Sequence, residues 1–274
     1  MHIAALVRNE NHVASISAMF PRVRIVRGSL DDRDILIEES SKAKIVMRAY
    51  HILCISPPKN QFLNQRLKAN WFDVKEMATD HEEGLLSIIE GLRNKDERDY
   101  GYLIHTSDTS VLIDKDFALG EYDKKLYDDI ADVDMIKERL SKRPGGSETM
   151  IMNAAAENTA ERRTVRTAII CPSAVYGFGK GPISKRGGKL TALMKATLLY
   201  KSAFKVENGK NVWSVIDIDN LAEAYVRLVE KALRSVYVNE GQWDSEGYYV
   251  AETEELVSMA PKFAQWPAYY QVLG

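Results

Sequence analysis

The chain has 274 residues, of which 45% are hydrophobic and 28% are charged, and this balance excludes a disordered protein. Lys and Arg number 37 against 39 Asp and Glu, so the formal net charge of -2 gives no positive field to attract nucleic acid or an anionic membrane. Two cysteines cannot form a disulfide framework, no apolar run reaches the roughly 20 residues of a membrane span, and the start lacks the zones of a signal peptide. We therefore expect a cytoplasmic protein that binds a small molecule, and neither nucleic acid nor membrane, with a homodimer left open.

The first 48 residues alternate between strand and helix patterns. Residues 2–8 form a nearly continuous apolar run, which is typical of a strand buried on both faces. A helix is predicted over 9–19, a strand over 23–26, a helix that begins near Asp32, and a strand over 44–47. This order at short spacing predicts a parallel sheet with crossover helices.

The alternation breaks over residues 49–76. The pair Pro57-Pro58 excludes a helix there, and the stretch has no clean period, so it is the least regular part expected in the chain. Residues 51–56 are the exception, because they could add a strand to the sheet. Regular structure resumes with a helix that starts over 79–83.

The second half returns to strands and helices after a charged segment. A strand over 100–105 runs into a polar stretch, and residues 113–148, which end in Pro-Gly-Gly, are expected to form an exposed excursion. The remaining elements are predicted as a helix over 150–161, a strand over 163–171, a Gly- and Lys-rich loop over 177–188, a helix over 190–200, a strand over 213–218, a helix over 219–233 and a strand over 247–250.

Five segments in this order resemble the extended short-chain dehydrogenase/reductase family, in its epimerase and dihydroflavonol-reductase-like branch. They are Ala-Leu-Val-Arg at 5–8, Gly-Ser-Leu-Asp-Asp at 28–32, Ile-His-Thr-Ser at 104–107, the segment 166–177 that ends in Pro-Ser-Ala-Val-Tyr-Gly, and Val-Ile-Asp-Ile-Asp-Asn-Leu-Ala at 215–222. In that family they are similar to the second strand, the turn after the third strand, the strand before the catalytic serine, the PxxVYG turn and the VHVDDLA helix start. The resemblance covers roughly residues 2–48 and 79–250.

The resemblance implies a doubly wound, Rossmann-like α/β fold in which the first strand is missing. The expected division is a truncated dinucleotide-binding domain over 1–176, with 49–76 as an irregular insert, and a small C-terminal substrate lobe over 177–274. The helix over 219–233 is expected to pack back on the first domain. The strand over 51–56 could then fill the position of the missing strand.

The resemblance also implies a cofactor, NADP or NAD, and a set of site residues. Arg8 would read a 2′-phosphate, Ser29 and Leu30 would flank the adenine, and Pro172 and Val175 would belong to the turn against the nicotinamide. The candidate catalytic residues are Ser107, Asp108 and Thr109, at the carboxyl end of a central strand where such folds bind ligands. The Lys- and Arg-bearing loop over 180–189 is expected to cover the opening.

Two departures from the family pattern bear on function. The GxxGxxG turn that should precede residue 2, in a unit of roughly 30 residues, is absent. The Tyr-xxx-Lys pair is absent from its expected place. The residue four positions after Tyr122 is Leu126, and the residue four positions after Tyr127 is Ala131, so neither tyrosine is followed by the lysine. Weak or absent dinucleotide binding follows from the first departure.

Several explanations stay open at this point. The protein is an NAD(P)-dependent oxidoreductase or epimerase by resemblance, a non-enzymatic NmrA-like dinucleotide sensor or scaffold, or a cofactor-independent enzyme that reuses the reductase pocket. The departures indicate either lost dehydrogenase chemistry or an imperfect gene model, with a missing first exon and a retained intron near 49–76. The five histidines show no ligand spacing, so no metal is predicted.

Overall fold

The computed structural model describes residues 2–49, 52–56, 81–95, 100–107, 109, 112, 117–142, 146–157, 165–183, 185, 197, 199, 201, 206–234 and 243–256. The expectations for 57–76, for most of the helix over 190–200 and for Asp108 therefore lie outside the described residues. The division into two domains also stays a prediction.

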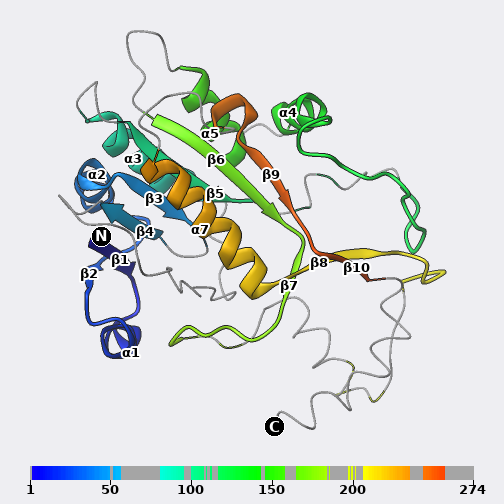
Figure 1. Ribbon diagram of the computed structural model, residues 1–274, viewed down its shortest axis with the longest axis horizontal. Helices are drawn as coiled ribbons and strands as arrows, with labels where there is room; N and C mark the ends of the chain where they lie inside the picture. The colour runs from blue at the N-terminus through cyan, green and yellow to red at the C-terminus, as the bar shows by residue number, and fades with distance from the viewer. Residues whose placement is uncertain are drawn as a thin grey trace.

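A sheet of seven strands forms the centre of the molecule, in the order β2-β1-β4-β3-β5-β6-β9 (Figure 1). These strands are β1 (His2–Val7), β2 (Val23–Arg27), β3 (Ile45–Arg48), β4 (Ile52–Ser56), β5 (Gly101–Thr106), β6 (Val165–Pro172) and β9 (Tyr248–Ala251). The strands pair in parallel except at β4, which runs antiparallel to both of its neighbours. The mixed α/β fold confirms the predicted fold class.

The strand β4 occupies the position that the missing first strand would take. It lies between β1 and β3, with Cys54 opposite Ala4 on one side and Val46 on the other. The prediction that residues 51–56 could fill this gap is confirmed. Because β4 follows β3 directly along the chain, it enters the gap in the reverse direction.

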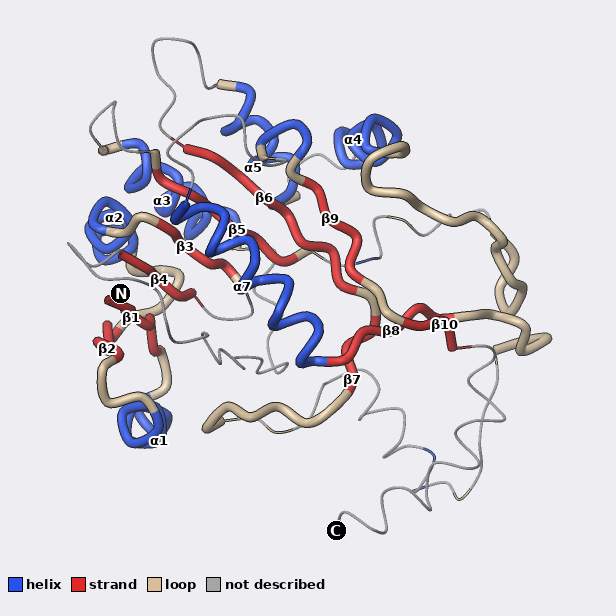
Figure 2. The backbone as a smooth tube through the Cα atoms, in the orientation of Figure 1, coloured by secondary structure: helices blue, strands red, loops and turns tan. Residues whose placement is uncertain are grey.

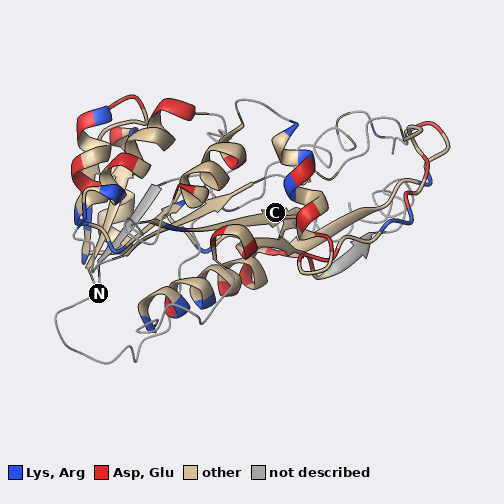
Figure 3. Cartoon of the chain, turned by 90° about the horizontal axis from the view of Figure 1, so that it is seen from above, with Lys and Arg blue, Asp and Glu red and all other residues tan. Residues whose placement is uncertain are grey.

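Helices cover both faces of the sheet (Figure 2). Those described are α1 (Glu10–Met19), α2 (Arg33–Lys42), α3 (Glu82–Arg93), α4 (Val133–Ser141), α5 (Ser147–Ala156), α7 (Ile218–Arg234) and the short 3-10 helix η3 (Asp244–Glu246). One core cluster joins α2, α3, α4 and α5 to the sheet, and a second joins α7 to the opposite face. Charged residues occur mostly along the helices and loops, whereas the strands contain few (Figure 3). The part of the chain that is described contains no helix long and apolar enough to span a bilayer.

The apolar stripe of α7 shows why this segment folds as a surface helix. Leu221, Tyr225, Leu228 and Ala232 recur at intervals of three or four residues and are all buried against the sheet. That spacing places them on one side of a helix, so the charged residues between them face water. The helix predicted over 219–233 is therefore confirmed, one residue longer at each end.

The helix α4 corrects the expectation for the charged segment 113–148. Val133, Ile136 and Leu140 lie three and four residues apart within it, and all three are buried in the core cluster of α3 and α5. The prediction of an exposed excursion was wrong for residues 133–141. The many charged residues of this segment made its short amphipathic period hard to recognise in the sequence. Residues 117–130 do run along the surface, with several exposed side chains.

A second sheet of three strands, not predicted from the sequence, lies beside the carboxyl end of β6. Its order is β10-β8-β7, with β7 (Ala174–Tyr176) parallel and β10 (Glu254–Leu256) antiparallel to β8 (Trp213–Asp217). Each outer strand has only three residues, too few for a periodic signal in the sequence.

Candidate functional site

A layer of level residues crosses four neighbouring strands and includes the polar side chains of Arg48, His105 and Tyr248. Arg48 of β3 pairs in register with His105 of β5, which is level with Ile169 of β6, which in turn is level with Tyr248 of β9. Residues level with one another on neighbouring strands point to the same face. Here this is the face covered by α5, so four consecutive strands present one layer to that helix.

Arg48 is buried, and its hydrogen bonds connect this layer to the starts of α5 and α3. Its guanidinium donates to the hydroxyl of Ser147 in α5 and to the carbonyl of His81 before α3, each at 3.2 Å. Nη1 of Arg48 also lies 3.2 Å from Nδ1 of His105. Because arginine can only donate, Nδ1 of His105 accepts and the ring proton lies on Nε2.

His105 is therefore neutral in the folded protein. Burial lowers the pKa of His105 well below its ordinary value, and the positive charge of Arg48 lowers it further. A neutral imidazole beside a buried cation accepts a hydrogen bond without bringing in a second positive charge.

Ser107 and Glu148 form the second polar pair of the site. The Ser107 hydroxyl donates to Oε1 of Glu148 at 2.6 Å, a short distance typical of a bond to a carboxylate. Glu148 lies in the first turn of α5, where the positive end of the helix dipole favours a negative charge. The backbone N–H of Ser107 donates to the carbonyl of Ile170, which fixes Ser107 beside β6.

Tyr248 adds a buried phenol to this pair. Its side chain is buried, and its hydroxyl lies near Ser107 and the thiol of Cys171, although not at hydrogen-bonding geometry to either. Burial raises the pKa of the Tyr248 phenol well above its ordinary value, and the neighbouring Cys171 raises it further. The phenol is therefore a neutral proton donor at every physiological pH.

The residues expected at the adenine end form a second cluster, which His81 connects to Arg48. Both the backbone N–H and the hydroxyl of Ser29 donate to the Asp32 carboxylate, at 2.6 and 3.1 Å. The exposed carboxylate of Asp31 accepts from Nε2 of His81 at 2.9 Å, and this bond, followed by the contact with the Ser29 hydroxyl at 3.2 Å, lowers the pKa of Asp31. Arg8 is exposed at the end of β1, and its charge also contributes to that lowered pKa.

Close packing holds this loop against α3. A Cβ on Gly84 would lie 2.8 Å from the carbonyl of Leu30, so only glycine allows the approach. Ser29 and Leu30 therefore act as a capped turn before α2, whatever they bind.

The remaining candidates flank the site at its other side. Pro172 ends β6 opposite Ala251 and is buried, whereas Val175 lies in β7 and packs against the cluster on the α7 face. Thr109 is half-buried and its carbonyl accepts from Leu112. The structure thus places Ser107 and Pro172 at one edge of the sheet, while Arg8, Ser29 and Leu30 lie beyond β4.

The reversed direction of β4 distinguishes this sheet from that of a doubly wound dinucleotide-binding fold. In a doubly wound fold, the strand at this position ends at the ligand edge and leads into a helix whose N–H groups hold the pyrophosphate. Here Ile52 begins β4 at that edge, level with Arg48, and Ser56 ends it at the opposite edge beside His2. β4 therefore ends at the edge of the sheet opposite to the one at which β3 and β5 end.

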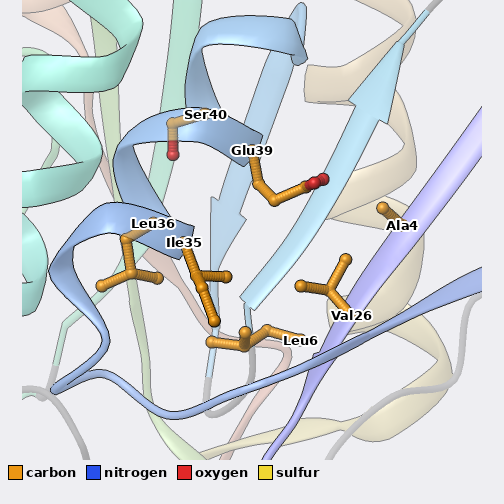
Figure 4. Close-up of a pocket in the computed structure, with 7 residues that line it drawn as sticks. All are labelled: Ala4, Leu6, Val26, Ile35, Leu36, Glu39 and Ser40. Atoms are coloured by element: carbon orange, nitrogen blue, oxygen red, sulfur yellow. The ribbon is translucent and has the colours of Figure 1, made fainter.

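A metal-binding group or a cavity could also mark a ligand site in the described residues. No group of three His, Cys, Asp or Glu side chains capable of holding a metal occurs among them. A small hollow beneath α2 has a volume of about 10 Å³, at the lower limit for one water molecule (Figure 4). It is lined by Ala4, Leu6, Val26, Ile35, Leu36, Glu39 and Ser40.

Comparison with known proteins identifies the architecture. Three solved structures share this architecture over 95% or more of this chain, at low sequence identity. They are a dTDP-glucose 4,6-dehydratase from Streptomyces venezuelae solved with NAD bound (14% identity, 96% of this chain and 68% of that chain, TM-score 0.54), a UDP-glucose 4-epimerase from Thermotoga maritima (12%, 96% and 74%, 0.52) and vestitone reductase from alfalfa (16%, 98% and 74%, 0.50). The fold is that of the extended short-chain dehydrogenases and reductases.

One curated protein is similar in sequence. The oxidase ucsJ from an Acremonium species is 28% identical over 264 residues, which is 93% of this chain and 67% of that protein. The chain thus spans about two thirds of the length of this relative, and no family model matches it. The family resemblance drawn from five short segments is confirmed at the level of the fold.

Sequence reasoning missed four members of the polar site, namely Arg48, His105, Glu148 and Tyr248. One local signal was available, since Arg48 ends an otherwise apolar strand at the ligand edge. His105 and Tyr248 lie within segments predicted as strands, and the strand pattern does not indicate a polar site. Glu148 gave no signal, because its partner lies 41 residues away in the sequence.

Proposed function

We propose that this chain is an oxidoreductase- or epimerase-like protein that binds a small organic molecule at the carboxyl edge of β5, β6 and β9, and that binds a dinucleotide weakly or not at all. The observation that carries the proposal is the antiparallel strand β4, between β1 and β3. It takes the place from which the pyrophosphate-binding turn would arise.

The energetic argument rests on the hydrogen bonds that this arrangement cannot make. Several backbone N–H groups at a helix N-terminus hold the pyrophosphate in a dinucleotide-binding fold. Hydrogen bonds to charged groups contribute about 1.5–3 kcal/mol each, and each 1.4 kcal/mol is a factor of ten in affinity. Their loss lowers dinucleotide affinity by orders of magnitude, even if Arg8, Ser29, Leu30, Pro172 and Val175 keep their contacts with NADP or NAD.

The groups at the carboxyl edge support proton transfer that needs no dinucleotide. Glu148 can accept a proton, and Ser107 orients its carboxylate through the 2.6 Å bond. Asp108 and Thr109 follow Ser107 directly and are proposed to line the same crevice. A cofactor-independent enzyme is therefore the second candidate function, and the Ser107–Glu148 pair is the observation that favours it.

Titration calorimetry with NADPH and with NADH on the whole chain tests the main proposal. We expect no heat of binding at micromolar concentrations of either nucleotide. Micromolar affinity would contradict the proposal, and the Arg8→Ala variant would then show whether Arg8 takes part. Loss of NADPH affinity with unchanged NADH affinity in that variant would assign Arg8 to the 2′-phosphate.

A thermal-shift screen of small carbonyl compounds and alcohols tests the ligand site. A compound that stabilises the protein should lose its effect in Asp108→Ala, while the unfolding transition without ligand stays unchanged. The matched control is Asp134→Ala, which removes an exposed carboxylate on α4 away from the sheet edge. A ligand whose effect is the same in both variants would place its site elsewhere.

A further inference from the structure

Arg48 lies where three elements of the fold meet. It ends the buried strand β3, and its guanidinium contacts His105 of β5, Ser147 at the start of α5 and the residue before α3. Arg48 is 2% exposed, and His105 and Ser147 are each 1% exposed. A buried cation costs free energy unless hydrogen bonds satisfy it, so each of these contacts constrains the element that it joins.

The planar guanidinium suits three contacts in different directions. Nη1 carries two hydrogens and lies 3.2 Å from Nδ1 of His105 and 3.2 Å from the hydroxyl oxygen of Ser147. Nη2 donates to the carbonyl of His81 at 3.2 Å. Because the fork of an arginine is rigid, these bonds fix the start of α5 relative to β5 and to the start of α3.

The start of α5 lacks a side-chain cap of its own. The N-cap residue is Gly146, which has no side chain to accept from the first N–H groups of the helix. On the side of the sheet, this turn is fastened by Arg48 through Ser147. On the side of α4, the hydroxyl of Thr149 donates to the carbonyl of Leu140 at 3.0 Å. The depth of the first turn over the sheet therefore depends on Arg48.

Glu148 follows Ser147 directly in this turn, and its carboxylate accepts from the Ser107 hydroxyl at 2.6 Å. We propose that Arg48 is a positioning residue for Glu148, because by holding Ser147 it keeps the first turn of α5 where the Glu148 carboxylate meets Ser107. This inference rests on the proposed function, in which Glu148 accepts a proton at the carboxyl edge of the sheet. Arg48 is itself too buried to touch a ligand, so it acts through Ser147.

A double-mutant cycle measures whether Glu148 still meets Ser107 when Arg48 is changed. Urea unfolding of Ser107→Ala, Glu148→Gln and the double variant gives the coupling between the two side chains. In the otherwise unchanged chain, we expect a coupling of about tenfold in the unfolding equilibrium constant, which corresponds to about 1.4 kcal/mol. In chains that also carry Arg48→Met, we expect the coupling to fall below about twofold, as for residues that do not touch.

Two further backgrounds separate positioning from general destabilisation. Ser147→Ala keeps the buried cation but removes its acceptor on α5, so the coupling between Ser107 and Glu148 should again fall below about twofold. Leu228→Ala removes a buried side chain of α7 on the opposite face of the sheet. It should lower stability and leave the coupling unchanged.

A coupling that persists in either Arg48→Met or Ser147→Ala would overturn the proposal, because Arg48 would then support the core without placing Glu148. Loss of the coupling in Leu228→Ala, or its absence from the otherwise unchanged chain, would overturn it as well. If Arg48→Met does not fold, the Ser147→Ala background decides the question. The cycle uses no ligand, so its failure leaves the proposed function standing, whereas a ligand effect that survives in Asp108→Ala contradicts the proposed site and leaves the positioning of Glu148 intact.

Discussion

The Ser107 hydroxyl joins the end of β5 to the first turn of α5 through its 2.6 Å bond to Glu148. Ser107 is buried, and Glu148 is partly so, which makes this bond stronger than one at the surface. The bond also orients the carboxylate toward the edge where parallel sheets of this fold bind ligands. Structure and candidate function therefore depend on the same pair.

The substitution Ser107→Ala tests the structural part of this bond. It leaves the Glu148 carboxylate without its hydroxyl donor in a partly buried place, so the free energy of unfolding should fall by about 1–3 kcal/mol. Urea unfolding followed by circular dichroism measures the change. Ser141→Ala, which removes an exposed hydroxyl on α4, should change the free energy by less than about 0.5 kcal/mol. Equal effects of the two substitutions would show that the Ser107–Glu148 bond contributes nothing to stability.

The buried imidazole of His105 makes stability depend on pH. Its pKa is lowered in the folded state, whereas an unfolded histidine titrates near 6.5, so the unfolded chain binds more protons below that pH. The stability that the neutral His105 contributes is fully present above about pH 6.5. It is lost as the pH falls toward the lowered folded pKa, by up to about 1.4 kcal/mol per pH unit. Unfolding free energies measured from pH 7.5 to 5 should fall for the wild type and less steeply for His105→Gln. His2→Gln, at an exposed position, should keep the wild-type slope.

Gly91 allows α3 to pack closely against α2. A Cβ at this position would lie 2.4 Å from the carbonyl of Ile37 and 2.8 Å from Cβ of Ser40. Alanine favours a helix over glycine by about 1 kcal/mol, but the overlap with backbone forces the two helices apart. Gly91→Ala should therefore lower the thermal midpoint, whereas Leu86→Ala on the exposed side of α3 should change it little. A higher midpoint in Gly91→Ala would mean that the helices separate at little cost.

Asp244 fastens the edge strand β9 to β6. Its carboxylate accepts from the N–H of Thr167 at 2.9 Å and pairs with Arg166 at 2.7 Å, and its φ is 61°. Asp244→Ala loses both contacts, and it leaves an alanine, whose side chain cannot form hydrogen bonds, in a left-handed conformation. We therefore expect the free energy of unfolding to fall by about 2–4 kcal/mol. Asp244→Asn keeps the acceptor and tolerates that conformation, so it should lose about half as much. Identical losses in urea unfolding would show that only the charge matters.

Local patterns in the sequence determined most of the elements. The apolar run of β1, the Asn9 cap that accepts from the N–H of Asn11 at the start of α1, and the 3.6-residue period of α7 are each encoded within one segment. Five such segments in the right order were enough to indicate a doubly wound fold. The same reasoning failed for α4, whose three buried residues are outnumbered by charges.

The tertiary structure alone decided the direction of β4 and the composition of the site. A strand pattern does not specify the partner of a strand, because the ladder hydrogen bonds come from residues far away in the sequence. The contacts of Arg48 with His105, 57 residues away, and of Ser107 with Glu148, 41 residues away, likewise arise only when α5 packs across the ends of the strands. Local patterns in the sequence thus determined most of the strands and helices, and the packing of distant segments determined which polar groups meet at the sheet edge.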